Sequence, residues 1–320
     1  MKEFLNYKGY LSKLSKKDLE LLLAKLKDYK IKYRDSLGIH PSISFGTELE
    51  FEHVLLYMVE KEFSKHPAYS SWIVQKDDSC SIRKDGYIIG GEVSSAILHD
   101  RKIDWKTLAE VLSSLIKLHA KATERTSLHV HVGSQIFAQD IQNVARFVKV
   151  WCIFEHVIFR FSYGKSSTFR PRIREFALPI ADATKLKCKY FPLFLENLIR
   201  PKDLNYDRKW ALNFRNCYLS GKEQDRNTIE IRIANGSLEG NVIQNTINFY
   251  LKLMLYVMSD RYDKEFINQL FQRLEPKDLV DYDKIIMEDA LLLVDLIFEQ
   301  SIDKINFLRQ YVKQDADLTR

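Results

Sequence analysis

Five short segments of the sequence alternate between apolar and polar residues, and this alternation limits the possible folds more than any other feature. Residues i and i+2 of a strand point to the same side, so each segment would have one apolar and one polar face. Such strands are typical of an antiparallel sheet with one side against a core. The segments are Ile43–Phe51, Glu92–Leu98, Leu128–Gly133, Lys209–Arg215 and Thr228–Ala234.

Helical patterns flank these segments. Leucines recur at the spacing of one helix face between Lys16 and Arg34, which predicts an N-terminal helix capped by Ser15. We therefore expect an α+β protein with an antiparallel β-sheet, helices packed on one side of it, and a helical C-terminal region. Further helices are predicted over Asp104–Thr123, Ala138–Phe161, Tyr190–Ile199, Glu239–Met258, Lys264–Arg273, Tyr282–Glu299 and Asp303–Val312.

Composition limits the class of protein. Of the 320 residues 46% are apolar, and the excess of Lys and Arg over Asp and Glu (49 − 43) gives a formal net charge of +6. The basic residues are spread along the chain, so we expect no nucleic-acid partner. The four cysteines form no CxxC pair, and no apolar run approaches the ~20 residues of a membrane span. The start lacks the apolar run of a secretory leader, so we expect a reduced, cytoplasmic protein.

The polar faces of the segments carry side chains that suit chemistry. Glu48 and Glu50 would lie about 7 Å apart at the ~3.3 Å rise of a strand. Carboxylates this close repel each other unless cations lie between them, and oxygen-rich sites with an occasional imidazole suit magnesium or manganese. Arg232, two residues from Glu230, would add a permanent positive charge suited to a transferring phosphoryl group. For each strand alone, a face turned to water is the alternative interpretation.

The motifs on these segments resemble those of the amidoligase family, in the glutamine synthetase and glutamate–cysteine ligase superfamily. They follow the family's order from Phe45 to Leu238. Asp78 stands where the family has a glycine, and Ala96 stands where it has a proline. The matches are GTELEF at 46–51, DDS at 77–79, EVSS at 92–95, HVHVG at 129–133, WALNF at 210–214, TIEIR at 228–232 and NGSL at 235–238.

The resemblance implies a half-barrel sheet like that of glutamine synthetase, with ATP and magnesium ions on its concave face. It also implies that ATP phosphorylates a carboxylate and that an amine then displaces phosphate to form an amide. The carboxylate and the amine (an amino acid, a peptide or a protein) are left open, as is the oligomeric state. On this interpretation the chain divides into a helical arm (1–40), an amidoligase-like catalytic domain (41–260) and a C-terminal helical extension packed on it (261–320).

The resemblance also gives roles to single residues. Arg232, Glu230 and Asn213 would be the catalytic set, with Arg232 stabilising the transferred phosphoryl and Asn213 orienting substrate or phosphate. Lys209 could touch phosphate or cap the edge of the sheet. Asp78 is the alternative to Asp77 as the residue that faces the site. The implied metal ligands are Glu48, Glu50, Glu92, Glu230, Asp77 and His131, and the implied nucleotide contacts are His129, His131, Arg232 and Lys209.

Other functions stay open. His129 and His131 could form the zinc site of a metal-dependent hydrolase, although four glutamates and an arginine suit harder cations. A degenerate nucleotide-binding scaffold is a third possibility. No GxGxxG or complete P-loop occurs, so ATP would need another architecture. A basic connection with Arg170, Arg172 and Arg174 could bind phosphate or be a solvated loop.

Overall fold

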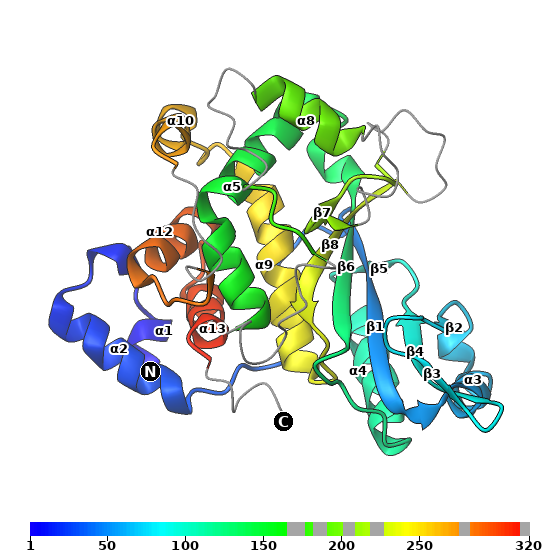
Figure 1. Cartoon of the computed structure of the whole chain (residues 1–320). Helices are drawn as coiled ribbons and strands as arrows, with labels where there is room; N and C mark the ends of the chain where they lie inside the picture. Colours follow the sequence, from blue (N-terminus) through cyan, green and yellow to red (C-terminus); the bar gives the residue numbers. More distant parts are fainter. Residues whose placement is uncertain (165–176, 182–190, 201–208, 218–226, 275–281, 314–320) are drawn as a thin grey trace.

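The computed structural model describes residues 1–164, 177–181, 191–200, 209–217, 227–274 and 282–313 (Figure 1). Its strands are β1 (Ser44–Leu55), β2 (Ile73–Gln75), β3 (Ile82–Lys84), β4 (Tyr87–Ser94), β5 (Leu98–His99), β6 (Ser127–Gly133), β7 (Leu212–Asn213) and β8 (Thr228–Asn235). They form one open antiparallel sheet in the order β2-β4-β1-β6-β8-β7, with β3 beside β4 and β5 beside β1. The predicted α+β class is confirmed.

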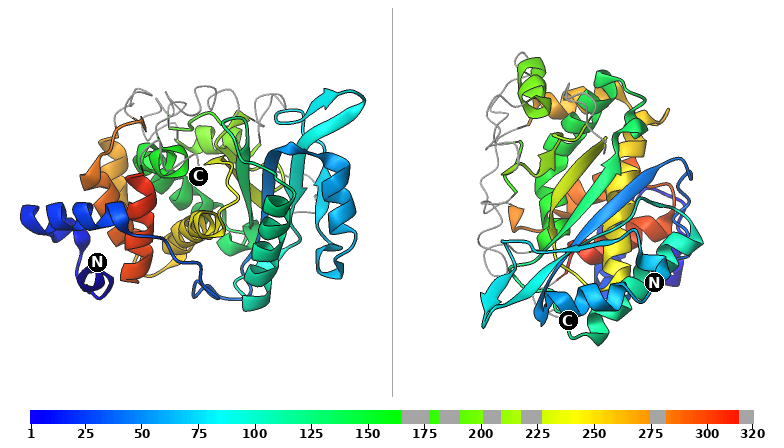
Figure 2. Two further views of the ribbon diagram at one scale, coloured as in Figure 1. Left: turned by 90° about the horizontal axis from the view of Figure 1, so that it is seen from below. Right: turned by 90° about the vertical axis from the view of Figure 1, so that its right-hand side faces the viewer.

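The apolar face of the sheet lies against helices. Phe45 of β1, Val130 of β6 and Ile231 of β8 are all buried. The helices α4 (Lys102–Lys117), α5 (Ile141–Tyr163) and α9 (Gly240–Met258) lie beside the strands (Figure 2), and Trp105 of α4 stacks on Phe45 with ring centroids 5.1 Å apart. Each large apolar side chain buried here contributes about 1.5–3 kcal/mol, so this layer fixes the sheet from one side.

The remaining helices surround this core. They are α1 (Lys2–Leu5), α2 (Lys16–Asp28), α3 (Leu56–Phe63), α8 (Phe191–Ile199), α10 (Lys264–Gln272), α12 (Met287–Ile297) and α13 (Ser301–Tyr311). Short 3-10 turns occur at η1 (Leu11–Lys13), η2 (Pro67–Tyr69) and η3 (Ser134–Phe137). In the described part of the chain, none of the helices combines the length and the apolar character needed to cross a membrane.

The N-terminal arm is bonded to the C-terminal helices. Asp295 of α12 accepts hydrogen bonds from the backbone N–H groups of Leu11 and Ser12, at 3.0 and 2.7 Å. The same carboxylate pairs with the buried Lys304 of α13 at 2.7 Å. A buried acid with several donors is held in one place, so residues at the two ends of the chain form one packed layer (Figure 1).

The helix predictions differ from the structure in several places, among them the end of α4 at Lys117 instead of Thr123 and the start of α12 at Met287 instead of Tyr282. The helix α2 ends at Asp28, because Tyr29 is extended and the backbone N–H of Arg34 donates to Gln244 of α9 at 2.8 Å. These tertiary bonds replace the helical ones that the leucine pattern predicts as far as Arg34. The helix α3 was not predicted, although its buried residues Leu56, Val59 and Phe63 repeat at helical spacing.

The strand predicted over Lys209–Arg215 was wrong in its extent. Only Leu212 and Asn213 form β7. The backbone turns directly afterwards, because the Asn213 side-chain oxygen accepts the N–H of Arg215 at 2.9 Å and the N–H of Cys217 bonds to Phe214. Asparagine commonly forms such local bonds, which compete with a continuing strand.

Candidate functional site

The polar face of the sheet brings acids and imidazoles from neighbouring strands together. Glu48 of β1 lies directly opposite Ser94 of β4 and His129 of β6. Glu50, on the same face of β1, lies opposite Glu92 of β4. Directly opposed residues have Cβ atoms about 4.5–5.5 Å apart. The two-residue alternation therefore places these side chains in one cluster.

The strands β8 and β7 extend this cluster. His131 of β6 lies opposite Glu230 of β8, which in turn lies opposite Asn213 of β7. The Asn213 amide donates a hydrogen bond to the Glu230 carboxylate at 2.8 Å. Asn213 thus orients one carboxylate oxygen while the other stays directed at neighbouring groups.

Arg232 adds a cation to the same cluster, because it lies two residues from Glu230 and therefore on the same face of β8. The pairing of β6 with β8 becomes irregular between Leu128 and Val130, where β8 has one residue more than β6. The Arg232 guanidinium donates a hydrogen bond to the Glu230 carboxylate, so a permanent cation lies at the β8 side of the cluster.

Glu48 is the centre of the cluster. Its carboxylate oxygens lie 2.9 Å from His129 Nδ1 and 3.0 Å from His131 Nε2. Despite the short distance, the buried His131 Nε2 forms no directed hydrogen bond with any described residue, and the same holds for the buried Nε of Arg232. Buried polar atoms without partners are costly. The cluster is therefore suited to a ligand that completes these contacts.

The pKa values of Glu48, Glu92 and His129 in the cluster are shifted from their ordinary values. Burial works to raise the pKa of Glu48, but the nearby imidazoles of His129 and His131 outweigh it and hold that pKa well below the ordinary value. Burial and then the charge of Glu48 raise the pKa of Glu92. For His129, burial and Arg232 work to lower the pKa, yet the surrounding carboxylates raise it above the usual value. Crowded negative charge is thus the dominant electrostatic property.

Three groups of side chains could each hold a metal ion. Within a group, one potential ligand atom from each residue lies within 4.8 Å of the others. Glu48 and Glu92 each belong to two groups, so the three form a continuous series. The groups are Glu48, His131 and Glu230; Glu48, Glu92 and His129; and Glu50, Asp77 and Glu92.

The donor set fits hard divalent cations. Carboxylate oxygens predominate, with one imidazole nitrogen in two of the groups and none in the third. Magnesium and manganese favour such oxygen-rich sites, whereas zinc favours sites with more nitrogen or sulfur. The residues present are therefore compatible with the cations that the sequence predicts.

The two aspartates of the DDS turn point to different surroundings. Asp77 accepts the backbone N–H of Ser79 at 2.7 Å and joins Glu50 and Glu92 in the third group. The Asp78 side chain is 87% exposed and pairs with Lys76. Of the two alternatives left open by the sequence, Asp77 is the one near the cluster.

Other predicted contacts are not brought to the cluster. Lys209 is exposed and precedes β7, so the strand alternation that placed it on the polar face does not hold there. A nucleotide contact by Lys209 stays a prediction. Arg170, Arg172 and Arg174 lie outside the described residues.

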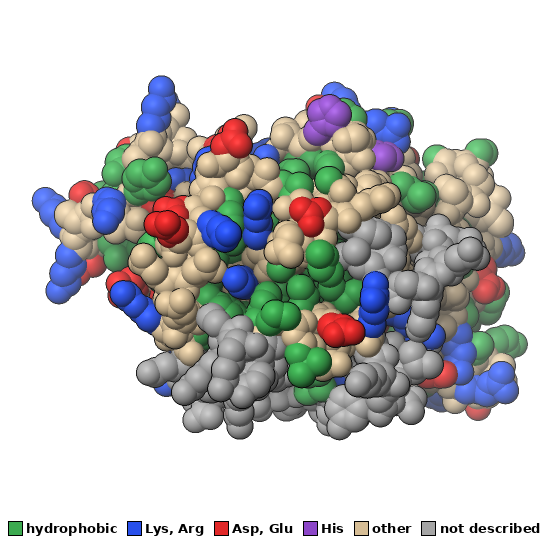
Figure 3. Space-filling view, turned by 90° about the horizontal axis from the view of Figure 1, so that it is seen from above, with side chains coloured by type: hydrophobic (Ala, Val, Ile, Leu, Met, Phe, Trp, Pro, Cys, Tyr) green, Lys and Arg blue, Asp and Glu red, His purple; other side chains and the backbone are tan. Residues whose placement is uncertain are grey.

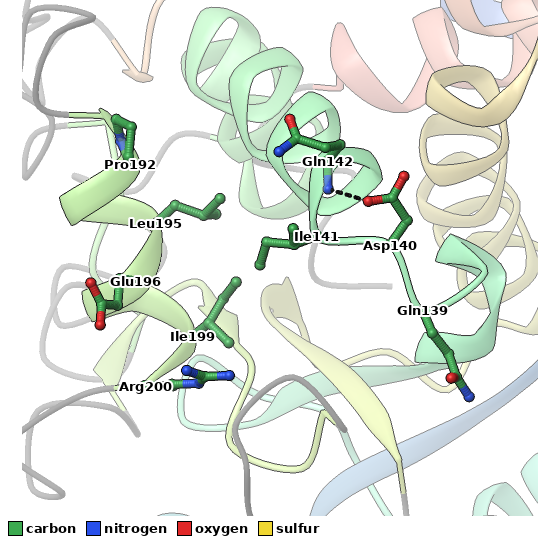
Figure 4. Close-up of a pocket in the computed structure, with 9 residues that line it drawn as sticks. All are labelled: Gln139, Asp140, Ile141, Gln142, Pro192, Leu195, Glu196, Ile199 and Arg200. Atoms are coloured by element: carbon green, nitrogen blue, oxygen red, sulfur yellow. Dashed lines mark hydrogen bonds between the residues drawn. The ribbon is translucent and has the colours of Figure 1, made fainter.

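A cavity of about 550 Å³ opens between the start of α5 and α8 (Figure 4). The side chains of Ile141, Leu195 and Ile199 point into it, and Glu196 and Arg200 lie at its border (Figure 4). Hydrophobic side chains also gather in the middle of the face seen in Figure 3, with single charged ones among them. The volume of the cavity between α5 and α8 is large enough for a small molecule. None of the three ligand groups lines this cavity.

Comparison with known proteins gives one match. The sequence model of a protein family described as "putative amidoligase enzyme" matches residues 41–254. This region begins just before β1 and ends within α9, so it contains all three ligand groups. Searches of curated proteins and of solved structures give no match.

Proposed function

The chain belongs to the amidoligase family, which gives it a ligase-type function, and on that premise we propose that it joins a carboxylate to an amine at the expense of ATP. The observation that carries the proposal is the continuous series of three ligand groups with Arg232 at one end. Such a combination of carboxylates and a guanidinium suits the handling of phosphoryl groups.

Magnesium ions would be held by the three ligand groups of the polar face. Bound there, they would neutralise the phosphate oxygens and orient the nucleotide. Manganese is the alternative cation. The crowding of Glu50 against Glu92 supports this assignment.

The chain's own residues supply positioning and charge. In the proposed reaction a carboxylate oxygen attacks the terminal phosphorus of ATP, and ADP leaves. The amine then attacks the acyl carbon, phosphate leaves, and the proton of the amine passes to solvent. Arg232 would stabilise negative charge on the transferred phosphoryl, and Asn213 would keep Glu230 in its orientation. The substrates themselves stay open among amino acids, peptides and proteins.

The test is a measurement of ADP release. The protein is incubated with ATP, magnesium and a panel of carboxylates and amines, and ADP and amide are both quantified. We expect ADP release that depends on magnesium and on both substrates. Absence of nucleotide binding in the presence of magnesium or manganese would overturn the proposal.

A metal-dependent hydrolase is the second candidate function. It is favoured by one observation: His129 and His131 both approach Glu48 within 3.0 Å. Metal analysis of the purified protein separates the two functions. Bound zinc together with hydrolysis that is indifferent to ATP would favour the hydrolase over the ligase.

A further inference from the structure

Glu155 of α5 is a buried acid outside the three ligand groups, with 1% exposure. Its Oε1 accepts hydrogen bonds from Trp151 Nε1 and the Ile180 N–H, at 2.8 and 2.7 Å. Its Oε2 accepts from the Ala181 N–H and the Tyr282 hydroxyl, at 2.8 and 3.0 Å. All four partners donate, so both oxygens of the ionised carboxylate are used.

Burying the Glu155 carboxylate in this apolar core costs free energy unless hydrogen bonds compensate for the lost water. Its neighbours on α5, Phe154 and Phe159, are buried in the core, and burial raises the pKa of Glu155 to about 7 against the opposing effect of its hydrogen bonds. Two of its four donors are backbone N–H groups of the short segment 177–181. Glu155 therefore fixes that segment to α5.

The segment 177–181 is in turn bonded to the stretch before β7. The Leu178 N–H donates to the Lys209 carbonyl, and the Ala211 N–H donates to the Leu178 carbonyl at 2.9 Å. The Ala211 carbonyl then accepts the N–H of Arg232 in β8 at 3.1 Å. A continuous series of backbone bonds thus runs from Glu155 to the edge of the sheet that carries Asn213 and Arg232.

We propose that Glu155 is a positioning residue for the candidate site. It fixes residues 177–181 as the outer neighbour of the stretch leading into β7, and it thereby holds Asn213 and Arg232 beside Glu230. β7 has only two residues, so its own pairing with β8 is too short to secure it. The consequence for turnover rests on the proposed ligase function, whereas the consequence for the backbone does not.

The backbone consequence is tested by amide hydrogen exchange. In Glu155→Gln the carboxamide oxygen can still accept from Trp151 and Ile180, but an NH2 group replaces the oxygen that accepts the N–H of Ala181. We expect exchange at Ala181, Ala211 and Arg232 to accelerate roughly tenfold or more, with the amides of β1 unchanged. Should this variant not fold, Glu155→Met gives an apolar side chain of similar length for the same measurement.

Asp295→Asn is the matched control. Asp295 is also a buried acid that accepts two backbone N–H groups from a remote segment, but that segment is the N-terminal arm. We expect faster exchange at Leu11 and Ser12 in this variant and no selective change at Ala211 or Arg232. Acceleration at Ala181 alone in the Glu155 variant would overturn the proposal, as would an equal effect of both variants on Arg232.

Activity provides a second, separable readout. With magnesium and ATP, Glu155→Gln should lower kcat by roughly tenfold at a nearly unchanged global stability, and Asp295→Asn should not. If wild type shows no turnover with any substrate, the proposed function fails while the exchange result still decides the positioning role. If exchange at Arg232 rises but kcat stays at the wild-type value, the positioning role for catalysis is wrong.

Discussion

Glu50 and Glu92 face each other directly across the β1–β4 pair, and both carboxylates are buried. Like charges in opposed positions destabilise a sheet. Burial and the charge of the nearby Glu48 also raise the pKa of Glu92. The arrangement is unfavourable for the protein alone and would become favourable if the two acids shared a cation.

The first prediction concerns Glu92→Gln. Gln75 and Ser94 both donate to one oxygen of Glu92, and a glutamine can keep that oxygen. The variant should therefore raise the stability of the metal-free protein by roughly 1 kcal/mol, because it removes a like charge, and should bind magnesium more weakly. Thermal unfolding in EDTA and in magnesium measures both effects, with Glu20→Gln on the exposed face of α2 as the control. A lower Tm in EDTA would show that repulsion is not the dominant effect.

The second prediction concerns Arg232→Lys. Lysine keeps the charge but not the planar fork that can contact Glu230 and a phosphoryl oxygen together. We expect kcat to fall by roughly 10²–10³-fold. The Tm should change much less than kcat, since lysine keeps a positive charge beside the buried Glu230. Steady-state ADP release and thermal unfolding test this. The control is Arg261→Ala, because Arg261 bonds to the carbonyls of Asp295 and Leu296 and not to the ligand groups. A large loss of Tm with unchanged kcat would mean that Arg232 is structural.

The third prediction separates the two histidines. His131 shares a ligand group with Glu48 and Glu230, whereas His129 shares one with Glu48 and Glu92. His131→Asn and His129→Asn should therefore weaken different classes of manganese site, each by roughly tenfold or more. Manganese titrations followed by electron paramagnetic resonance resolve the classes. Identical isotherms for the two variants would contradict the separate groups.

The fourth prediction is a pH dependence of stability. The pKa of Glu155 rises from 4.5 to about 7 on folding. Between these values the folded protein binds more protons than the unfolded chain, so the free energy of unfolding falls as the pH rises toward 7. At ~1.4 kcal/mol per pKa unit the Glu155 contribution is about 3 kcal/mol.

Urea unfolding across this pH range measures the effect, and the difference between wild type and Glu155→Gln isolates it from other titrating groups. Asp100 is a useful contrast. Burial works to raise its pKa, but donors that include Ile39 N–H and Trp105 Nε1 outweigh burial and lower it. The stability that ionised Asp100 contributes is therefore lost only when the pH falls below the ordinary pKa of an aspartate. A curve for Glu155→Gln parallel to that of wild type would refute the prediction.

The sequence allowed the polar face of the sheet to be predicted because a strand has a period of two. Once Glu48 and Glu50 are placed on one side of β1, and His129 and His131 on one side of β6, antiparallel pairing brings them together. The amidoligase motifs then fixed which strands carry the acids. The α+β class follows from the same alternation.

Other features depend on contacts between distant residues and leave no local pattern. The bulge in β8 arises from how β6 and β8 pair, which the alternation of either strand does not reveal. The bonds from Glu155 to residues 180 and 181, and from Asp295 to the N-terminal arm, join segments that no short motif connects. The early end of α2 has the same origin, since tertiary bonds override helix propensity.

The sharing of Glu48 and Glu92 between neighbouring ligand groups has a consequence for how the protein would respond to its ionic surroundings. An ion entering the middle group draws on oxygens that either neighbour also needs, so loading one position alters the affinity of the next. We therefore expect the divalent cations to bind in successive steps whose affinities depend on one another, and not as independent sites.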